Sequence, residues 1–434
     1  MSSRSMHINL FVHGCGHHRA AWRHSESSVE RLGDISYFEE LAQIAERGRL
    51  DAIFFADGSA VDSVADGPRW FLEPLTCLAA MSRATRHIGL ISTVSSTFST
   101  PFHAARMLAS MDHISGGRIG WNVVTSMFDA EARNHGYEAI PSHAQRYERA
   151  EEFISVVLRL WDSWDQSALI LDRHGDYADP ALVRPILHQG RYFQVDGPLT
   201  IPRPPQGHPV LFQAGASEPG RELAARRAEA IYAVAHDLQA AQHYYADIKQ
   251  RVKNLGRHDP VPIMPGLVTY IGSTQEEARA KQRQLDELLP EQASLRQLKS
   301  FILQDCLDWE LDEPVPALPP LKDFTGPKGR YATILRIIEQ EKPTVRQLLG
   351  RLAAGGGHCM VVGTPEQIAD HMELWFRNGG ADGFNLMPPL LPHGIHEFVE
   401  HVVPILQKRG LFRTEYTCGT LRGHLGIPRP GEEA

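Results

Sequence analysis

The 434-residue sequence predicts an α/β fold, a single TIM (β/α)8 barrel with insertions. Three observations support this prediction. Apolar runs alternate with amphipathic helical patterns along the chain, eight such runs are present, and several of them end directly in polar residues. Continuous apolar runs suit strands that are buried on both faces, as in a parallel sheet. A doubly wound open sheet is the structural alternative.

The predicted strands are short apolar segments that end in turn residues or polar side chains. The run over 50–56 is closed by Asp57, and the run over 118–124 is followed by Thr125 and Ser126. Strands are expected at residues 7–13, 50–56, 87–94, 118–124, 209–215, 230–235, 261–271 and 381–387.

Helices are predicted between the strands from periodicity and from end signals. Proline opens the helix predicted over 101–114, and Gly116 ends it, because glycine adopts the left-handed conformation easily. Ser142 and Gln145 have the spacing of a capping box, and residues 364–367 repeat that pattern. Further helices are expected at residues 36–47, 73–82, 217–229, 238–252, 274–289 and 395–408.

The chain is expected to form one domain over residues 1–434. Two long stretches, at about 165–208 and 290–358, read as insertions, and residues 411–434 read as a polar C-terminal tail. Structureless segments of such length are usually functional or mobile.

Composition argues against several classes of protein. The net charge is −8 and the basic residues are dispersed, which argues against a nucleic-acid partner. No apolar run approaches membrane-spanning length, and residues 1–6 lack the apolar core of a signal peptide. Five scattered cysteines favour a reducing compartment. We therefore expect a cytoplasmic protein without a membrane partner.

Polar side chains gather where the predicted strands end, the edge at which barrel sites are built. Asp57 closes the second strand, Thr93 lies at the end of the third, and Asn122 lies near the end of the fourth. His143 and Tyr147 lie one turn apart on one face of the following helix. For the fourth strand taken alone, a buried strand with a polar rim is the simpler interpretation.

Gly215 ends the fifth strand, and Ala216 and Ser217 lead into the following helix. Small residues at a helix N-terminus suit an anion such as phosphate, while an ordinary serine N-cap explains the pattern equally well. The segment resembles a serine-hydrolase elbow, but Pro219 replaces its last glycine. The glycines after the first strand lack the third glycine of a dinucleotide fingerprint, so no NAD(P)H site is expected.

The loop after the first strand carries candidate substrate residues, His17, Arg19, Trp22 and Arg23. An arginine pair beside an aromatic ring suits an anionic substrate, and a solvated loop is the alternative. The histidines of this region lack the spacing of zinc motifs, so no metal site is predicted. A metal-dependent barrel hydrolase is nevertheless a competing hypothesis, because histidines and carboxylates lie at strand ends.

Several segments together resemble the nitrilotriacetate monooxygenase, dibenzothiophene-sulfone monooxygenase and pristinamycin synthase group of the bacterial-luciferase superfamily. The resemblance covers essentially the whole chain and rests on residues 16–23, 115–126, 146–153, 213–217, 381–387 and 416–430. It implies a luciferase-like barrel that binds FMN at its carboxyl rim. It also implies that a separate NAD(P)H:FMN reductase supplies reduced FMN, which acts with O2 to oxidise a C–N or C–S centre of a small organic molecule, nitrilotriacetate- or organosulfur-like.

The resemblance also implies roles for individual residues. The implied cofactor-binding residues are Asp57, Thr93, Asn122, His143, Tyr147, Gly215, Ala216 and Ser217. Asn122 and His143 are in addition the implied catalytic residues, and Ser217 is the implied phosphate contact. We expect a bulge or a non-proline cis peptide near Thr93–Ser95, and a homodimer or homotetramer. A non-catalytic flavin-binding protein of the same fold is a further competing hypothesis.

Overall fold

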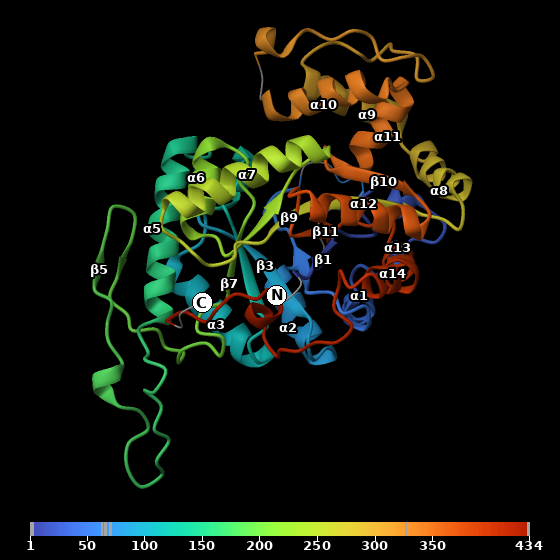
Figure 1. Ribbon diagram of the computed structural model, residues 1–434. Coiled ribbons are helices and arrows are strands. Elements are labelled where there is room, and N and C mark those ends of the chain that lie inside the picture. Colours follow the sequence, from blue (N-terminus) through green and yellow to red (C-terminus); the bar gives the residue numbers. More distant parts are fainter. Residues whose placement is uncertain (1–3, 62–63, 65–66, 69–71, 326–327, 432–434) are drawn as a thin grey trace.

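In the computed structural model, eight parallel strands form a barrel surrounded by helices (Figure 1). The structure describes residues 4–61, 64, 67–68, 72–325 and 328–431. The barrel strands are β1 (His7–Val12), β2 (Ala52–Phe55), β3 (Gly89–Ser95), β4 (Ile119–Val124), β7 (Val210–Gln213), β8 (Ala230–Ala233), β9 (Ile263–Ile271) and β11 (Gly383–Leu386). The ring closes because β11 pairs with both β1 and β9, and β9 pairs with β8. The predicted barrel is therefore confirmed, and the open sheet is wrong.

The ladder between β3 and β4 is regular. Residues Leu90–Ser95 pair in unbroken register with residues Ile119–Val124. The cis peptide bonds found in the described part of the chain lie elsewhere, at Gly197–Pro198 and Leu391–Pro392. The bulge or non-proline cis bond expected near Thr93–Ser95 is therefore wrong, because six consecutive pairs align the two strands without an extra residue.

Helices cover the outer face of the barrel, and their ends follow the sequence signals. Both capping boxes are present, and Gly116 ends α3 (Pro101–Ser115) with φ of 71°. The other covering helices are α1 (Ile35–Arg47), α2 (Pro74–Ala84), α5 (His143–Trp161), α6 (Glu218–Arg227), α7 (Leu238–Asn254), α8 (Gln275–Glu287), α12 (Pro365–Arg377), α13 (His393–Glu397) and α14 (Val403–Lys408). Single helical turns occur at Ala21–Arg23, Val29–Arg31, Pro180–Leu182, Leu321–Asp323 and Phe398–Val402.

Residues 290–358, called the helical segment below, contain α9 (Glu291–Ile302), α10 (Lys328–Glu341) and α11 (Val345–Gly355). Their buried faces form a separate apolar cluster that includes Leu298, Ile334 and Leu348. The strand that follows, β10 (Cys359–Gly363), was not predicted. It pairs with the second half of β9, outside the closed ring.

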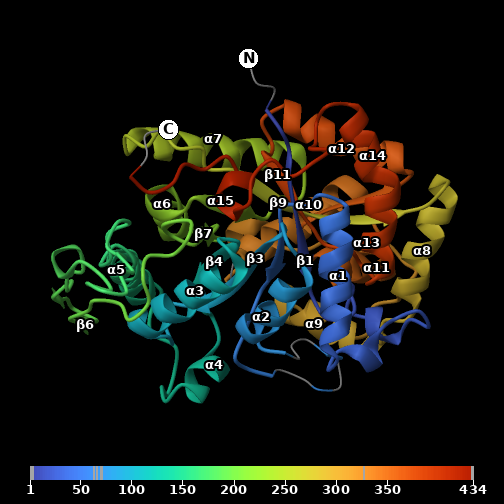
Figure 2. The ribbon, with the colours of Figure 1, turned by 90° about the horizontal axis from the view of Figure 1, so that it is seen from below.

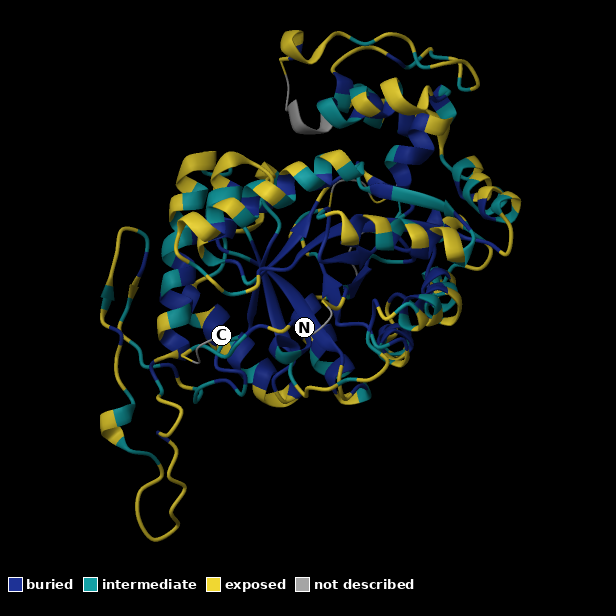
Figure 3. Ribbon diagram, in the orientation of Figure 1, coloured by how far each residue is buried: buried dark blue, intermediate teal, exposed yellow. Residues whose placement is uncertain are grey.

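Residues 165–208 leave the barrel as an extended hairpin that Figure 1 shows projecting from the body. Its regular structure consists of the helical turn Pro180–Leu182 and a short antiparallel pair, β5 (His188–Gln189) and β6 (Gln194–Val195). Most of this segment is exposed, whereas the barrel strands are buried (Figure 3).

The C-terminal tail packs across the amino end of the barrel. The short helix α15 (Leu421–His424) places Leu421 against β3 and β4, where a Cβ on Gly89 or Gly120 would meet its side chain. In Figure 2, α15 lies in the upper half of the molecule, near β7 and β11, while α9 and the short helix α4 (Asp129–Asn134) lie in the lower half. No helix of the described residues is long and apolar enough to cross a bilayer.

Candidate functional site

The carboxyl end of the barrel is referred to as the mouth. Next to the mouth, four aromatic rings fill the interior of the barrel. Phe11, Phe54, Phe212 and Tyr232 come from β1, β2, β7 and β8, and all four are buried. The Phe54 ring centroid lies 5.1 Å from that of Phe11, 6.3 Å from that of Phe212 and 5.7 Å from that of Tyr232. Because these rings fill the barrel, a ligand would lie above them, at the mouth.

Two of the predicted site residues meet on adjacent strands at this level. Thr93 and Asn122 are register partners, and Asn122 is also the register partner of Phe212, so all three side chains point into the barrel. The Asn122 Nδ2 donates to Thr93 Oγ1 at 3.0 Å, and that hydroxyl donates to the Phe55 carbonyl at 2.8 Å. The Asn122 Oδ1 is buried, and no described residue donates to it. A buried acceptor is therefore left open to a ligand.

Three further predicted residues form a second group. The His143 and Tyr147 rings, in the first turn of α5 and one turn later, lie 4.8 Å apart between centroids. The Ser217 hydroxyl, at the start of α6, lies 3.4 Å from the Tyr147 hydroxyl. This contact joins α5 to α6 at their N-terminal ends.

The backbone around Ser217 is tightly packed and suits an anion. The Ser217 Oγ accepts the Gly220 N–H at 3.3 Å, so Ser217 is a true N-cap. A Cβ on Gly215 would lie 2.7 Å from the Gly220 Cα, so only glycine fits there. Ala216 and Ser217 are exposed, which leaves the N-terminus of α6 accessible to a negatively charged group.

The two groups lie at the same end of the barrel. Val123, one residue after Asn122, pairs with Gln213, the last residue of β7. Ser217 follows Gln213 by four residues, in the loop that leaves the mouth. The side chains of Asn122 and Ser217 therefore border one region, on neighbouring strand ends.

Asp57 lies at the rim, after β2, with an exposed side chain. Neighbouring protein atoms reduce the hydration of the Asp57 carboxylate, and this raises its pKa. The negative charges of Glu73 and Glu131 act in the same direction. Glu131 is buried and joins two loops of the mouth, because its carboxylate accepts the N–H groups of Ser59 at 3.4 Å and Phe128 at 3.3 Å. The Asp57 carboxylate accepts the Gly58 N–H at 2.8 Å, and among the described residues it forms no hydrogen bond with Thr93 or Asn122. Asp57 therefore lies at the rim of the site and not at its centre.

The structure separates the four candidate substrate residues. His17 packs against Phe11, with ring centroids 4.6 Å apart, and its Nε2 lies 3.0 Å from the Phe11 carbonyl oxygen. Arg19 contacts Gln297 of α9, and the Arg23 guanidinium lies 4.3 Å from the centre of the Trp22 ring. His17 thus lies beside the aromatic rings that fill the barrel, while Arg19 and Arg23 contact different residues.

Two residues beside His17 were not singled out from the sequence. The Tyr232 hydroxyl lies 2.9 Å from the Nε2 of His358, which immediately precedes β10. Burial, with His13 and His358 nearby, lowers the pKa of His17 well below its ordinary value. The sequence offered one signal for Tyr232: its hydroxyl group stands among the apolar residues of β8. Nothing in the sequence around His358 linked it to the barrel.

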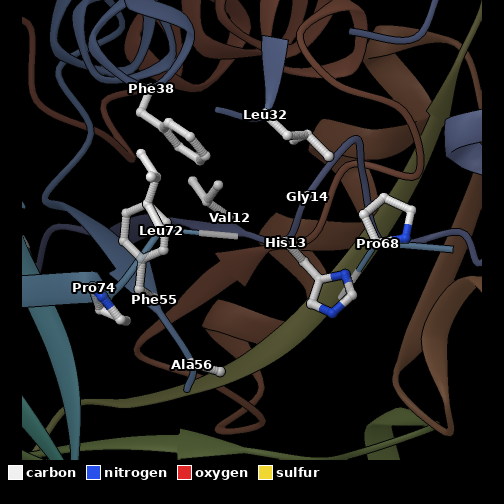
Figure 4. A pocket seen from close by; sticks show the side chains of 10 residues that line it. All are labelled: Val12, His13, Gly14, Leu32, Phe38, Phe55, Ala56, Pro68, Leu72 and Pro74. Atoms are coloured by element: carbon white, nitrogen blue, oxygen red, sulfur yellow. The ribbon is translucent and has the colours of Figure 1, made fainter. Parts of the chain in front are cut away.

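A small apolar pocket adjoins the mouth, between the ends of β1 and β2 and the start of α1 (Figure 4). Its volume is about 30 Å³, and His13 is its only titratable lining side chain. The remaining lining residues are Val12, Gly14, Leu32, Phe38, Phe55, Ala56, Pro68, Leu72 and Pro74. A pocket of this size accommodates a small apolar group.

Comparison with known proteins relates this geometry to a family. Residues 10–383 match the model of the luciferase-like monooxygenase family. N-acetyl-S-(2-succino)cysteine monooxygenase of Bacillus subtilis (strain 168) is 43% identical, with 99% of each chain covered. Nitrilotriacetate monooxygenase component A of Aminobacter aminovorans is 42% identical, covering 99% of this chain and 98% of the relative.

Solved structures agree with the sequence comparison. The riboflavin lyase RcaE, determined with modified FMN and riboflavin, has a TM-score of 0.85 and 31% identity, covering 98% of this chain and 97% of that chain. The family that the sequence motifs resemble is therefore confirmed over the whole barrel. The chain belongs to the luciferase-like monooxygenase family.

Proposed function

We propose that this protein is a two-component monooxygenase that uses reduced FMN and O2 to oxidise a small organic substrate at a C–N or C–S bond. The observation that carries the proposal is the open acceptor of Asn122 and the Ser217 N-cap at one end of the barrel. A nitrilotriacetate- or organosulfur-like substrate is the class that the related monooxygenases suggest.

The residues present fit FMN. An isoalloxazine carries N–H donors, and the buried Oδ1 of Asn122 is an acceptor without a partner among the described residues. The phosphate would be held by the Ser217 hydroxyl and by the exposed N-terminus of α6, where the helix dipole favours negative charge. Tyr147 and His143 would line the path between the two ends of the cofactor.

Reduced FMN supplies the electrons that activate O2 when it is bound. The chain's own residues would orient the ring and exclude water. The aromatic layer of Phe11, Phe54, Phe212 and Tyr232 closes the barrel from below. The loops joined through Glu131 and the helical segment contacted by Arg19 would shield the mouth from the sides.

A separate NAD(P)H:FMN reductase is the implied transient partner. The sequence carries no dinucleotide fingerprint, and one relative bears the name component A, which indicates a system of more than one protein. The substrate is expected to contact His17, which packs against the Phe11 ring, and to place a small apolar group in the pocket that His13 lines.

The competing hypotheses have less support. Within the described residues, no three His, Cys, Asp or Glu side chains are grouped so that they could hold a metal ion, and no other observation favours a hydrolase. A non-catalytic flavin-binding protein differs only in turnover, so an assay must decide.

The test is a turnover assay with purified protein, a flavin reductase, NADH, FMN and ¹⁸O2, over a panel of aminopolycarboxylates, thioethers and sulfones. We expect one substrate class to give product that carries ¹⁸O or has lost a C–N or C–S bond. NADH consumption that yields only hydrogen peroxide with every substrate would favour the non-catalytic alternative.

A further inference from the structure

Of the four aromatic rings that fill the barrel, the ring of Tyr232 alone carries a polar group. The Tyr232 hydroxyl lies 2.9 Å from the His358 Nε2 and 3.6 Å from the Met387 Sδ. The Tyr232 ring centroid lies 5.5 Å from that of Phe11 and 5.7 Å from that of Phe54, and these contacts fix its orientation. Because Met387 directly follows β11, the hydroxyl lies at the mouth.

The backbone of β9 makes room for the His358 imidazole. A Cβ on Gly266 would lie 2.4 Å from the His358 Nδ1 and 2.7 Å from the Met387 Sδ, so a side chain at position 266 would displace both groups. Gly266 belongs to the closed ring, where it pairs with Asn385 of β11. The glycine thus keeps the imidazole over the end of the ring, within reach of the Tyr232 hydroxyl.

The Tyr232 hydroxyl retains one hydrogen-bonding function for a ligand. Burial raises the pKa of Tyr232, so the hydroxyl stays protonated. If the His358 Nε2 carries a hydrogen, it donates to the Tyr232 oxygen, and the phenol proton then faces only a thioether, which is a weak acceptor. If that nitrogen is bare, it accepts the phenol proton, and no described residue donates to the Tyr232 oxygen. In both arrangements a buried polar group is left to a ligand.

The Tyr232–His358 pair lies across the mouth from the proposed flavin contacts. The closed ring runs β1, β2, β3, β4, β7, β8, β9 and β11, so β9 is four strands away from β3, and β11 is four strands away from β4. Thr93 and Asn122 lie on β3 and β4, whereas His358 lies against Gly266 of β9. A flavin ring that contacts Asn122 would therefore face this pair across the space left for the substrate.

We propose that Tyr232 is a specificity-determining contact for the substrate, with His358 as its positioning residue. The His358 Nε2–H donates to the Tyr232 oxygen, and the phenol proton is directed to an oxygen of the substrate, on a carboxylate or a sulfone at or next to the C–N or C–S bond. Aminopolycarboxylates and sulfones share such an oxygen, whereas thioethers lack it. The inference rests on the proposed function and adds the group by which the substrate is selected.

The test compares kcat/KM of the parent and of Tyr232→Phe, with a flavin reductase supplying reduced FMN. The probes are nitrilotriacetate, dibenzothiophene sulfone and diethyl sulfide, which carry carboxylates, a sulfone and no oxygen, respectively. The variant should lose about 10- to 100-fold with nitrilotriacetate or about 5-fold with the sulfone, because a hydrogen bond to a charged acceptor is the stronger one. It should lose nothing with diethyl sulfide. The probe that shows the loss identifies the oxygen as that of a carboxylate or of a sulfone.

A double-mutant cycle tests the role of His358. His358→Leu should show the same loss as Tyr232→Phe, and the double variant should show no further loss, because His358 acts through the phenol. His358→Gln, whose amide N–H can donate to the hydroxyl, should recover part of the lost activity. Losses that add up in the double variant would contradict the positioning role.

Tyr331→Phe is the matched control, since this buried tyrosine of the helical segment donates its hydroxyl to the Pro319 carbonyl at 2.7 Å. Its kcat/KM should equal the parent's with every probe, and all variants should bind FMN within about twofold of the parent. Equal kcat/KM for the parent and Tyr232→Phe would overturn the inference and leave the proposed function standing, and so would a parent that oxidises diethyl sulfide alone. A parent that releases only hydrogen peroxide, yet binds a probe more tightly than Tyr232→Phe does by the change in FMN absorbance, would refute the proposed function alone. A parent that neither oxidises nor binds any of the three probes would overturn the inference as well.

Discussion

Asn122 combines a satisfied nitrogen with an unsatisfied oxygen. Its Nδ2 donates to Thr93, while its buried Oδ1 receives no hydrogen bond from the described residues. An unpaired buried acceptor costs roughly 1–3 kcal/mol, so a ligand that donates to it recovers that free energy on binding. The polar group is thus placed for a ligand rather than for stability.

The substitution Asn122→Ala should weaken FMN binding by about 3- to 10-fold, the value of one hydrogen bond, and should lower turnover further. The free energy of unfolding should change by less than about 1 kcal/mol, because one good bond and one unpaired oxygen are lost together. Flavin fluorescence titration and chemical unfolding measure the two quantities.

Asn9→Ala is the matched control, since Asn9 is another buried strand asparagine with an unpartnered Oδ1. It pairs with Ala52 and Asn385, the first and third residues of β2 and β11, below the mouth. Its removal should leave the FMN dissociation constant unchanged. Equal effects of the two substitutions on FMN binding would remove Asn122 from the site.

Ser217 caps α6 and is also the proposed phosphate contact. Ser217→Asp separates these roles, because aspartate is as good an N-cap as serine, while its charge repels a phosphate. FMN binding should weaken by more than about tenfold, from a like-charge contact of at least 1.4 kcal/mol. Riboflavin, which lacks the phosphate, should bind parent and variant equally, and an equal loss for both flavins would count against the assignment.

At the level of elements, apolar runs predicted all eight barrel strands, because nearly all strand residues are buried on both faces of the sheet. The strand β10 was missed although Cys359-Met-Val-Val-Gly363 is an apolar run, since it followed a segment that read as an insertion. The polar pair β5 and β6 carried no such signal. Capping residues fixed the helix starts, because their hydrogen bonds are local.

The candidate site was predictable only in part, for a related reason. Asn122, Tyr147 and Ser217 lie at strand and helix ends, which local pattern locates. The contact between Tyr232 and His358 joins residues 126 positions apart, and only the closed barrel brings them together.

The contact between α12 and β10 predicts a pH effect on stability. The His371 Nε2 lies 3.2 Å from the Cys359 Sγ, and burial lowers the pKa of His371 to about 4. In the unfolded chain this pKa is about 6.5. As the pH falls from 6.5 toward 4, the unfolded state takes up the proton first, so stability falls, by about 2 kcal/mol at pH 5.

His371→Leu should remove this contribution. The variant should lose about 2 kcal/mol less stability than the parent between pH 7.5 and pH 5.0, measured by denaturant unfolding at both values. Substitution of His243, which is exposed on α7, is the control and should not alter the pH dependence. Parallel losses in the parent and His371→Leu would show that His371 titrates normally in the folded protein.

On the scale of the whole molecule, the contacts of the C-terminal tail and the candidate ligand-binding residues lie at opposite ends of the barrel. The amino end is sealed by the tail, where Arg422 is buried and pairs with Glu229 at 2.6 Å and with the His208 carbonyl at 2.8 Å. The polar candidates gather at the opposite end. This division is typical of TIM barrels, whose amino face supports the fold.

Arg422→Met should lower the free energy of unfolding by about 3 kcal/mol, because it leaves Glu229 largely buried without its partner. Arg422→Lys keeps the charge and should cost less. FMN affinity of the folded protein should stay within about twofold of the parent's in both variants, since the tail lies at the far end of the barrel. A loss of FMN affinity without a loss of stability would contradict the separation.

The central claim is that one FMN contacts both Asn122 and Ser217 at the mouth. A crystal structure of the protein with FMN tests this most directly. We expect an isoalloxazine nitrogen about 3 Å from the Asn122 Oδ1, with the phosphate against Ser217 and the N-terminus of α6. An FMN that lies outside the mouth, or that reaches only one of these two side chains, would contradict it.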